Sequence, residues 1–495
     1  MITACIRRLS LLSVVLLGLF QPLLLKAADR ASDASFNVRA YGAAGDGKQL
    51  DSPAIDSAIN AASATGGGTV VVPAGTYLCG SIHLKSNIHL VIDSGATILG
   101  APQAMNAYDQ TEPWPNNNPY QDGGHCYFHN SLIWGENLTN VSITGNGAIN
   151  GGGLVSQDKI LDRMCGYQFW GKSTPPPANV TYPVCRLGNK SIALKLCRNV
   201  VIRDITIAHG GHFAIIVTGC DNTTVDNVTM DTNRDGIDID CCHNVMVSNC
   251  RVNSPNDDGI CPKSSYALGH NVLTENLTIT NCQVSGFKEG TLIDGTMVPT
   301  PKGLGRIKFG TEASGGFRNC TISNCTFRCC RGLALEEVDS GILEDITVTN
   351  LSMYDVRNYA IYITTGIRNR GGDLKQPSTL RNISISNVTA DHVDKASGIQ
   401  IMGTAENPVE DIRLSNIRLI CNGGGTTADT VSPPELGKGY PEPKPVSAYG
   451  LFVRHASGLT LADIDITLAN PDARPVAQFE DVKGLTIRDS PSLGH

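Results

Sequence analysis

The sequence predicts an all-β fold in which short parallel strands stack coil upon coil into a solenoid, a parallel β-helix. One observation is a repeated segment: 233–237 (Asn-Arg-Asp-Gly-Ile) returns 23 residues later as 256–260 (Asn-Asp-Asp-Gly-Ile). A second is that a recurring asparagine, as at Asn199 and Asn222, begins short runs of alternating apolar residues. The third is the abundance of glycine, 52 of 495 residues, spread evenly along the chain. Such a repeat is typical of a solenoid whose coils stack directly on one another.

The first residues predict a leader that is not part of the fold. Two arginines at 7–8 precede an apolar run at 9–25, and small residues follow the run. This is the arrangement of a secretory signal peptide, which we place at 1–28. A transmembrane anchor is the alternative, but Gln21-Pro22 interrupts the apolar run and leaves it short for a membrane span. We therefore expect an exported protein, extracellular or periplasmic, that contacts no membrane after removal of the signal peptide.

Residues 29–100 are predicted to form an N-terminal cap and the first coils. A short strand and a glycine turn come first, and a helix begins at about Ser52. The apolar residues that share its predicted buried face are Ile55, Ile59 and Ala62. Three glycines at 66–68 end the helix, and a buried strand follows at 69–72. A solenoid needs such a cap because its first coil would otherwise expose an open edge and a core.

Residues 101–190 are predicted to mix coils with inserted loops. Trp114 and Trp170 lie in this irregular part of the chain. Each tryptophan could form a platform on which a sugar stacks, or could anchor a packed loop, and both interpretations stay open.

Residues 191–495 are predicted to form the main body of the β-helix, with a long loop near 421–447. Along the whole solenoid, the asparagines that precede alternating apolar residues are Asn140, Asn199, Asn222, Asn244, Asn276, Asn319 and Asn382. The alternation places every second side chain in the core. Several of these asparagines lie in Asn-x-Ser/Thr sequons. Because they recur at one position of the coil, we interpret them as turn residues rather than glycan sites.

Composition narrows the classes of partner. The net charge of −7, with 17% charged residues, gives no support for nucleic acid as a partner. A polyanionic ligand would need a local basic patch against that background. The even spread of turn residues favours one solenoid unit rather than several domains, and we expect a monomer.

The 17 cysteines of the chain are concentrated in the repeats. Cys250, Cys282 and Cys325 each follow an asparagine at one position of the coil, which predicts buried cysteines stacked from coil to coil. The adjacent pairs 241–242 and 329–330 lack the CxxC spacing of a zinc site, and we predict no metal site and no cofactor. Because the protein is expected to be exported, we also expect some disulfides, without assigning them.

Three carboxylates are predicted to crowd together on the outside of the solenoid. The repeat aligns Asp235 with Asp258 and Arg234 with Asp257. Since stacked parallel strands lie about 4.8 Å apart, Asp235, Asp257 and Asp258 would share one patch. Like charges that close raise one another's pKa, so the crowding costs stability unless it serves a function. A solvated acidic turn is the alternative, but these residues recur in register.

With these residues the chain resembles glycoside hydrolase family 28, the polygalacturonase family of pectin-degrading enzymes. The segment 36–84, which runs from FNVRAYGAAGDG to GSIHL, is similar to the usual N-terminal part of that family. Segment 233–235 matches the family's Asn-Thr-Asp motif with Arg for Thr, and 256–258 matches its Gly-Asp-Asp motif with Asn for Gly. Lys263 follows as the family pattern has it. The resemblance covers almost the whole mature chain and implies a right-handed parallel β-helix that hydrolyses pectic polysaccharide.

The resemblance also implies roles for single residues. Asp257 would be the general acid, Asp235 and Asp258 would hold and deprotonate a water molecule with inversion, and Asn233 and Lys263 would bind substrate. Hydrolysis of a glycosidic bond needs one protonated carboxyl group and one ionised carboxylate. Crowding of the aspartates would separate their pKa values and so supply both forms at one pH. A coil spacing of roughly 5 Å suggests retention by the general rule. Because a third carboxylate can hold water beside the pair, we nevertheless expect inversion.

Two other motifs of the family are altered. Its Gly-His-Gly motif corresponds to 303–312, which contains no histidine, and its Arg-Ile-Lys motif corresponds to 334–336 (Ala-Leu-Glu). Arg306 and Lys308 could supply the missing positive charge from the neighbouring coil and bind a substrate carboxylate. Alternatively, the sugar bound there carries no carboxylate and lies against Ala334, which a rhamnogalacturonan substrate would allow.

His212 and Glu312 are two further candidates for substrate binding. His212 lies one coil before Asp235, where it would either replace the missing histidine or cap a turn. Glu312 belongs to an acidic cluster near the expected cleft, together with Glu336 and Glu337.

Three functions remain open. The first is a glycosidase acting on pectic polysaccharide or oligosaccharide, with polygalacturonan or rhamnogalacturonan as its substrate. The second is a calcium-dependent lyase, in which aspartates bind Ca²⁺ and a lysine or arginine abstracts a proton. The third is a non-catalytic carbohydrate-binding solenoid. An unsaturated product and sensitivity to a chelator would distinguish the lyase from the hydrolase, and an absence of turnover would favour the binding protein.

Overall fold

A computed structural model describes residues 35–112, 123–125, 127–156, 186–370, 376–436 and 445–494. From Ser35 onward the chain forms one compact unit. The expected signal peptide, Trp114 and Trp170 lie outside the described residues. Within those residues, no helix combines the length and the apolar character needed to cross a membrane.

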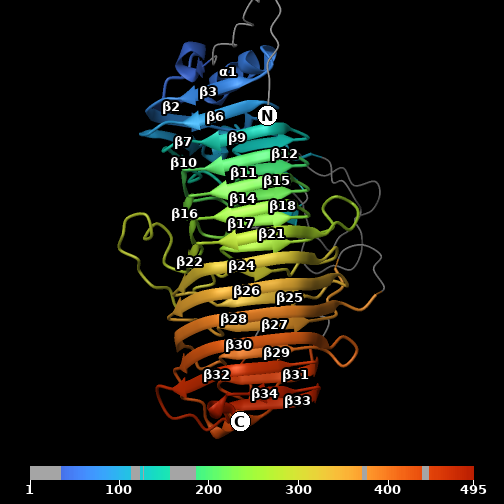
Figure 1. The fold of residues 1–495 in the computed structure, drawn as a ribbon. Helices are drawn as coiled ribbons and strands as arrows, with labels where there is room; N and C mark the ends of the chain where they lie inside the picture. The colour runs from blue at the N-terminus through green and yellow to red at the C-terminus, as the bar shows by residue number, and fades with distance from the viewer. Residues whose placement is uncertain are drawn as a thin grey trace, which may run out of the picture. The chain divides into compact units, whose positions relative to one another are not determined.

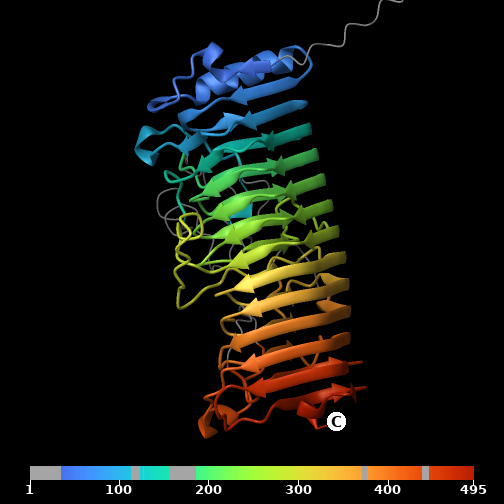
Figure 2. The same cartoon turned by 60° about the vertical axis from the view of Figure 1, so that its left-hand side comes forward.

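Parallel strands stack into three ladders along the axis of this unit (Figure 1 and Figure 2). The first ladder runs its whole length and contains β1 (Ser35–Asn37), β3 (Gly68–Val72), β6 (Ile88–Ile92), β9 (Thr139–Thr144), β12 (Arg198–Arg203), β15 (Asp221–Asp226), β18 (His243–Ser248), β21 (Thr274–Thr280), β24 (Phe317–Arg328), β26 (Ile342–Tyr354), β28 (Thr379–Val393), β30 (Val409–Cys421), β32 (Thr460–Leu468) and β34 (Thr486–Arg488).

The second ladder ends where its last strand pairs with the second half of β24. Its members are β2 (Asp46–Leu50), β4 (Gly75–Cys79), β7 (Ala96–Gly100), β10 (Ala148–Asn150), β13 (Thr206–Ala208), β16 (Thr229–Asp231), β19 (Arg251–Asn253) and β22 (Gln283–Ser285). From β24 onward, single long strands take the place of paired short ones.

The third ladder contains or adjoins the three predicted catalytic aspartates. It contains β5 (Ile82–His83), β8 (Ile133–Glu136), β11 (Lys190–Lys195), β14 (Phe213–Thr218), β17 (Asp235–Asp240), β20 (Ile260–Lys263), β23 (Lys308–Phe309), β25 (Leu333–Glu337), β27 (Ile361–Thr365), β29 (Ile399–Met402), β31 (Leu451–Ser457) and β33 (Ala477–Lys483). Three parallel ladders around one core make a right-handed parallel β-helix, so the predicted fold class is confirmed.

The register agrees with the repeat seen in the sequence. β17 pairs with β20 so that Ile237 lies beside Ile260 and Asp240 beside Lys263, the predicted offset of 23 residues. Inside the coils, isoleucine and valine side chains stack in rows, because strands in register place equivalent residues directly above one another. Almost the whole apolar core is one continuous cluster that runs the length of the unit.

The recurring asparagines lie near the beginning of first-ladder strands, as Asn199 does in β12 and Asn222 in β15. All seven have a positive φ, from 53° to 57°, a conformation that asparagine tolerates better than most residues. Their side-chain amides link successive coils: Asn199 Nδ2 donates to Asn140 Oδ1 at 2.9 Å, and Asn222 Nδ2 donates to Asn199 Oδ1 at 3.1 Å. Each asparagine therefore marks a local bend inside a strand rather than a separate turn, and the amide contacts between coils explain why asparagine returns.

The cysteines of the described part of the chain are all buried thiols without a disulfide. The expectation of disulfides is wrong for these residues. Cys197, Cys220 and Cys242 stack in successive coils, with backbone N to Sγ distances of 3.4 and 3.3 Å along the row. Cys250, Cys282 and Cys325, whose repeat position predicted burial, are also buried, and these side chains fill the core as small apolar groups.

The N-terminal cap contains the single α-helix of the described residues, α1 (Ser52–Ala64). Its buried residues include Ile55, Ile59 and Ala62, as predicted. Gly66 and Gly67 follow with φ values of 98° and 132°, which end the helix and turn the chain into β3. The short 3-10 helices are η1 (Val38–Tyr41), η2 (Gln103–Met105), η3 (Gly123–His125), η4 (Thr427–Thr430) and η5 (Pro491–Leu493).

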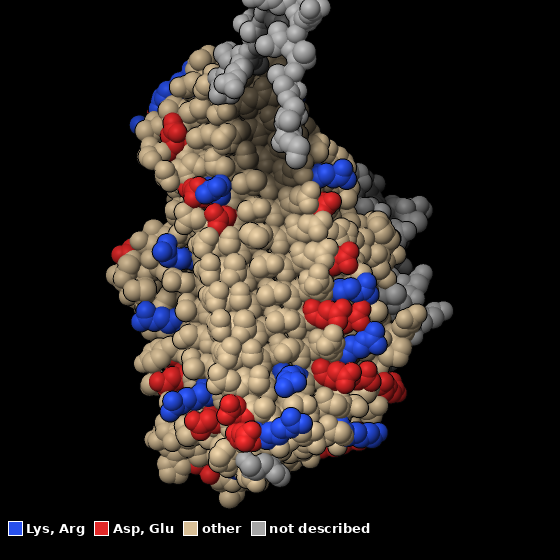
Figure 3. Space-filling view, viewed as in Figure 1, with Lys and Arg blue, Asp and Glu red and all other residues tan. Residues whose placement is uncertain are grey.

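The distribution of charge on one face reflects the outward strand positions. In Figure 3, Lys, Arg, Asp and Glu lie mainly along two edges of the face shown, and its broad middle carries few charges. Outward positions that pair from strand to strand in the first ladder are mostly uncharged, namely Thr224, Met246, Thr278, Thr321, Thr347 and Ser384. On this face the charged side chains are therefore grouped at the edges rather than spread evenly.

Candidate active site

The three predicted aspartates meet at one edge of the third ladder. Asp235 begins β17, and Asp257 and Asp258 immediately precede β20, the next strand of that ladder. One carboxylate oxygen from each of the three lies within 4.8 Å of the others. The register that aligns the repeats is thus also what brings these carboxyl groups together.

Backbone hydrogen bonds fix the two segments that carry the acids. The amide N–H of Asp258 donates to Asp235 Oδ1 at 3.0 Å and lies 3.1 Å from Asp257 Oδ1. Ser254 Oγ lies 2.6 Å from the carbonyl oxygen of Arg234 and 3.0 Å from that of Asp257. These contacts hold the backbones of β17 and the segment before β20 at a set distance, so that the carboxyl groups face one another.

Asp258 is held as an anion by two cations of the following coil. Its Oδ1 lies 2.6 Å from Arg306 Nε and its Oδ2 lies 3.2 Å from Lys308 Nζ. All three side chains are almost completely buried. Burial alone would raise the pKa of Asp258, but the charges of Arg306, Lys308 and Lys263 outweigh it and lower the pKa below its ordinary value. The carboxylate is therefore ionised throughout the neutral range.

The pKa of Asp235 is shifted in the opposite direction from that of Asp258. It is buried, and its oxygen accepts from a backbone N–H. Burial, followed by the nearby charges of Asp257 and Asp238, raises its pKa well above the ordinary value. Two acids on adjacent strands, Asp235 and Asp258, thus have pKa values moved in opposite directions, which is the arrangement that acid–base chemistry needs.

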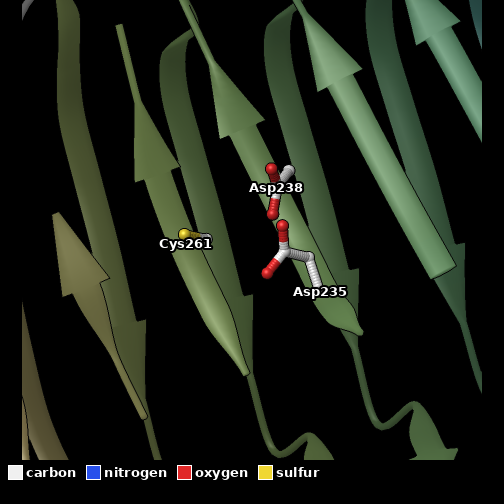
Figure 4. A group of neighbouring side chains, drawn as sticks. All are labelled: Asp235, Asp238 and Cys261. Carbon is white, nitrogen blue, oxygen red and sulfur yellow. The ribbon is translucent and has the colours of Figure 1, made fainter. Parts of the chain in front are cut away.

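A fourth carboxyl group, which the sequence did not single out, lies beside Asp235. Figure 4 shows Asp235 and Asp238 of β17 with their carboxyl groups pointing toward one another, and Cys261 of the neighbouring strand beside them. Asp238 is fully buried, and neither of its oxygens has a hydrogen-bond partner among the residues that the structure describes. His125 Nε2 lies 3.5 Å from Asp238 Oδ2. Burial raises the pKa of Asp238 to about 7, against the opposing charges of Lys263 and His125.

An open pocket of about 850 Å³ begins at the acids. It is lined by nine Lys or Arg side chains and five Asp or Glu side chains, although the whole chain has a net charge of −7. Five of these cations were not predicted from the sequence: Lys302, Arg331, Arg357, Arg368 and Arg370. The pocket is thus the local basic patch that a polyanionic ligand would require.

Comparison with known proteins identifies related chains. A family model described as "Rhamnogalacturonase A/epimerase, pectate lyase-like" matches residues 35–261. A probable polygalacturonase of Vitis vinifera is 24% identical over 402 residues, which cover 77% of this chain and 73% of that protein. An exopolygalacturonase of Platanus acerifolia is 25% identical over 439 residues, which cover 83% of this chain and 98% of that protein. These relatives span the repeats that carry the three aspartates.

These relatives support the predicted resemblance to glycoside hydrolase family 28, and the chain is a glycosidase. Its fold is shared with the family 28 exopolygalacturonase of Yersinia enterocolitica, which matches with a TM-score of 0.68 at 19% identity over 92% of this chain and 78% of that chain.

Of the substrate-binding residues predicted for this glycosidase, four line the pocket. Lys263 and Glu312 form an ion pair in its wall, with Lys263 Nζ 3.0 Å from Glu312 Oε2, and Arg306 and Lys308 lie against Asp258. Glu312 also lies 3.3 Å from Arg368. These side chains are mostly buried and form ion pairs with one another or with Asp258. They therefore affect the charge of the pocket mainly through these ion pairs.

Asn233 and His212 are placed differently from the prediction. Asn233 is not among the residues that line the pocket, and its Nδ2 donates to Glu289 Oε2 at 3.1 Å. His212 is fully buried, with its ring edge-on to Phe213 at 4.2 Å between centroids and with Gly124 packed over both rings. Direct substrate binding by His212 is therefore wrong, because a segment almost 90 residues earlier in the chain covers it.

The alternative of a neutral sugar against Ala334 is also wrong. Ala334 is fully buried in an outer apolar cluster with Tyr359 and Tyr362, so no ligand reaches it. Tyr359 further accepts a hydrogen bond from Arg306. The surface where the family has its Arg-Ile-Lys motif is thus filled by tyrosine rings, and the cations Arg306 and Lys308 lie one coil earlier, under Asp258.

Two carboxylate-rich groups have spacings compatible with a metal ion: Asp235 with Asp257 and Asp258, and Asp235 with Asp238 and Cys261. In the first group both oxygens of Asp258 already have a cation within 3.2 Å. All three residues of the second group are buried. The absence of a metal site therefore stays a prediction.

Asp238 and Asp240 are expected to affect stability with opposite signs. The pKa of Asp238 is raised to about 7, so the stability it contributes is complete below its unfolded value and is lost as pH rises through about 7. Asp238→Asn should remove this loss. Between the unfolded pKa of Asp and about pH 7, the free energy of unfolding of the variant should therefore increase relative to that of wild type by up to about 1.4 kcal/mol per pH unit. Thermal or denaturant unfolding between pH 4 and pH 8 measures the difference.

Asp240→Asn is the matched control from the same strand. Burial opposes ionisation of Asp240, but His125 at 3.2 Å and Ser265 lower its pKa, so its contribution is present above the unfolded value and is lost in acid. The variant should therefore be less stable than wild type at neutral pH and approach it as pH falls. If both variants changed stability in the same direction with pH, the electrostatic description of this strand would be incorrect.

Proposed function

We propose that this exported glycosidase hydrolyses glycosidic bonds of pectic polysaccharide at a site where the substrate carries uronate groups. The observation that carries the proposal is the junction of the three aspartates with a pocket in which Lys and Arg outnumber Asp and Glu nine to five. A polymer of negatively charged sugars is complementary to that pocket. The relatives described as a polygalacturonase and an exopolygalacturonase support the same class of substrate.

We assign Asp257 as the proton donor. It is partly exposed, with 25% of its side chain accessible, whereas Asp235 and Asp258 are buried beneath it. The glycosidic oxygen of a bound chain would therefore meet Asp257 first. Asp257 gives its proton to that oxygen as the bond to the anomeric carbon breaks, and water attacks the carbon while losing its proton to ionised Asp258.

The way in which Asp258 is held supports inversion at the anomeric carbon. Each of its oxygens lies within 3.2 Å of a cationic nitrogen, so the carboxylate cannot advance to form a bond with the sugar. It can still accept a proton from a water molecule held between it and Asp235. Proton NMR of the first product formed tests this step: inversion gives the opposite anomer initially, and retention gives the original one.

The test of the function is product analysis on homogalacturonan and rhamnogalacturonan side by side, with and without a chelator. New reducing ends without ultraviolet absorbance, unaffected by the chelator, would support the hydrolase. Unsaturated products that require a divalent cation would identify a lyase. Absence of turnover on both polymers would identify a carbohydrate-binding solenoid, and preference for one polymer would identify the glycan.

Lys308→Met is expected to change the pH profile rather than substrate charge recognition. Because Lys308 Nζ lies 3.2 Å from Asp258 and helps to lower its pKa, its loss should raise that pKa. Asp258 must be ionised to accept a proton, so the acidic limb of kcat should move to higher pH. The shift should be the same on native oligosaccharides and on oligosaccharides whose uronates are reduced to neutral sugars. A loss of binding confined to the native substrate would instead make Lys308 a ligand of the substrate carboxylate.

A further inference from the structure

Arg234 stands where the family motif has threonine, and it is the cation nearest to the proposed proton donor. Its guanidinium forms an ion pair with Asp257 Oδ2. Both side chains are partly exposed, 22% for Arg234 and 25% for Asp257, and both line the pocket. This ion pair therefore lies at the point where the substrate must approach the acid.

The ion pair conflicts with the task of Asp257 in the substrate-free enzyme. A carboxylate bonded to a guanidinium is stabilised as an anion, and an anion has no proton to donate. The backbone on both sides is fixed: Ser254 Oγ contacts the carbonyl oxygens of Arg234 and Asp257, and Gly305 N–H donates to the Asp257 carbonyl at 2.8 Å. The conflict can therefore be relieved only by a movement of the two side chains.

We propose that Arg234 is a charge-sensing positioning residue: a uronate carboxylate next to the bond to be cleaved takes the guanidinium from Asp257 and releases Asp257 to act as the proton donor. The inference rests on the proposed function and adds a basis for its substrate selectivity. A guanidinium can bind a sugar carboxylate through two parallel hydrogen bonds, and the surrounding cations of the pocket attract that carboxylate. A neutral sugar offers no competing anion.

The proton balance of the step is simple. When Arg234 moves to the sugar carboxylate, Asp257 takes one proton from solvent, and it gives that proton to the glycosidic oxygen as the bond breaks. The attacking water leaves its hydroxyl on the anomeric carbon and its proton on Asp258. Binding of the charged sugar thus shifts Asp257 from the state paired with Arg234 to the released, protonated state. Only a ligand that stabilises the released state more than the paired state can increase activity in this way.

The test compares wild type and Arg234→Thr on uronate oligosaccharides and on the same oligosaccharides with carboxyl groups reduced to alcohols. Wild type should have a much higher kcat on the native substrate. In Arg234→Thr, Asp257 is no longer held as an anion, so kcat on the reduced substrate should rise by roughly tenfold or more, the scale of one charge-assisted hydrogen bond. KM for the native substrate should rise at the same time. The ratio of the two kcat values should fall toward one.

Arg203→Thr is the matched control, because Arg203 forms an exposed ion pair with Asp204 outside the pocket and its loss should leave the ratio unchanged. Arg234→Lys keeps the charge without the forked geometry and should retain part of the discrimination. A merely structural role of Arg234 would lower the melting temperature and reduce turnover of both substrates alike. An unchanged ratio in Arg234→Thr would overturn the proposal.

A second measurement requires no variant. The guanidinium nitrogens of Arg234 can be observed by NMR in wild-type protein with and without free galacturonic acid, using galactose as the neutral control. The uronate should shift their resonances as the guanidinium leaves Asp257, and galactose should not; equal effects would overturn the proposal. Failure of the proposed function gives a different result, since wild type would then turn over no uronate polymer at all.

Discussion

Asp257→Asn is expected to lower turnover on pectic polymer by on the order of 10²–10⁴, the usual effect of removing a general acid. Asparagine keeps the shape of the side chain but has no proton of suitable acidity to give to the leaving oxygen. The fold should not change, because Asp257 lies in the segment before β20 and its backbone contacts remain. Initial rates on polymer, measured beside thermal unfolding, check both parts of this expectation.

Asp394→Asn is the matched control for Asp257→Asn. Asp394 lines the same pocket but follows β28, several coils toward the C-terminus, so turnover should stay within a few-fold of wild type. A substrate with an activated leaving group gives a further check, because departure of such a group needs little proton transfer and should restore the rate of Asp257→Asn. Near-normal turnover of Asp257→Asn on polymer would show that another group donates the proton.

The residues of the site that are related by the 23-residue repeat could be predicted from the sequence. An offset of 23 residues aligned 233–237 with 256–260, and the parallel register of β17 and β20 preserves that offset. Because neighbouring strands in such a sheet are close, aligned residues become neighbours, and the meeting of Asp235, Asp257 and Asp258 followed directly. The same reasoning correctly predicted that Cys250, Cys282 and Cys325 are buried.

Asp238 was missed because regular alternation fails where β17 begins. In a strand, residues three apart point to opposite faces, which separates Asp235 from Asp238. The structure instead brings their carboxyl groups together, since Asp235 lies in the pocket while Ile237, two residues later, lies in the core. Gly236 between them packs closely against the carbonyl oxygen of Gly259, and no periodic pattern reveals the local change of direction.

The cations of the pocket were missed because later coils differ in length. Between β24 and β26 the offset is 26 residues, as for Cys320 and Ile346, but between β26 and β28 it is 37. A search at a constant offset loses the register there. Arg331 and Arg357 are themselves 26 residues apart, and both line the pocket. Alignment by strand pattern rather than by a fixed spacing would have identified this pair.

His212 shows a different limit of sequence reasoning. Its position one coil before Asp235 was correctly inferred, since β14 pairs with β17. Its burial depends on the segment 123–125, which packs over it from far earlier in the chain. Contacts of that kind are set by the path of a loop, and a loop carries no periodic signal.

Ile279→Asp is expected to unfold part of the β-helix. Ile279 is fully buried in β21, between Val247 of β18 and Ile322 of β24. An unpaired carboxylate at that position loses its water and finds no cation among the isoleucines and valines of the core. The cost should be at least about 3–5 kcal/mol, a large share of the stability of an ordinary domain. Unfolding monitored by circular dichroism should show a clearly lower midpoint.

Thr278→Asp provides the control, because it places the same charge on the adjacent residue of the same strand but on its outward face. That variant should unfold within about 0.5 kcal/mol of wild type, as surface substitutions usually do. In a solenoid each coil depends on its neighbours, so the Ile279→Asp lesion should spread to the coils of β18 and β24 and raise their hydrogen exchange before that of the N-terminal cap. Equal midpoints for the two variants would mean that the inward and outward faces of β21 are assigned incorrectly.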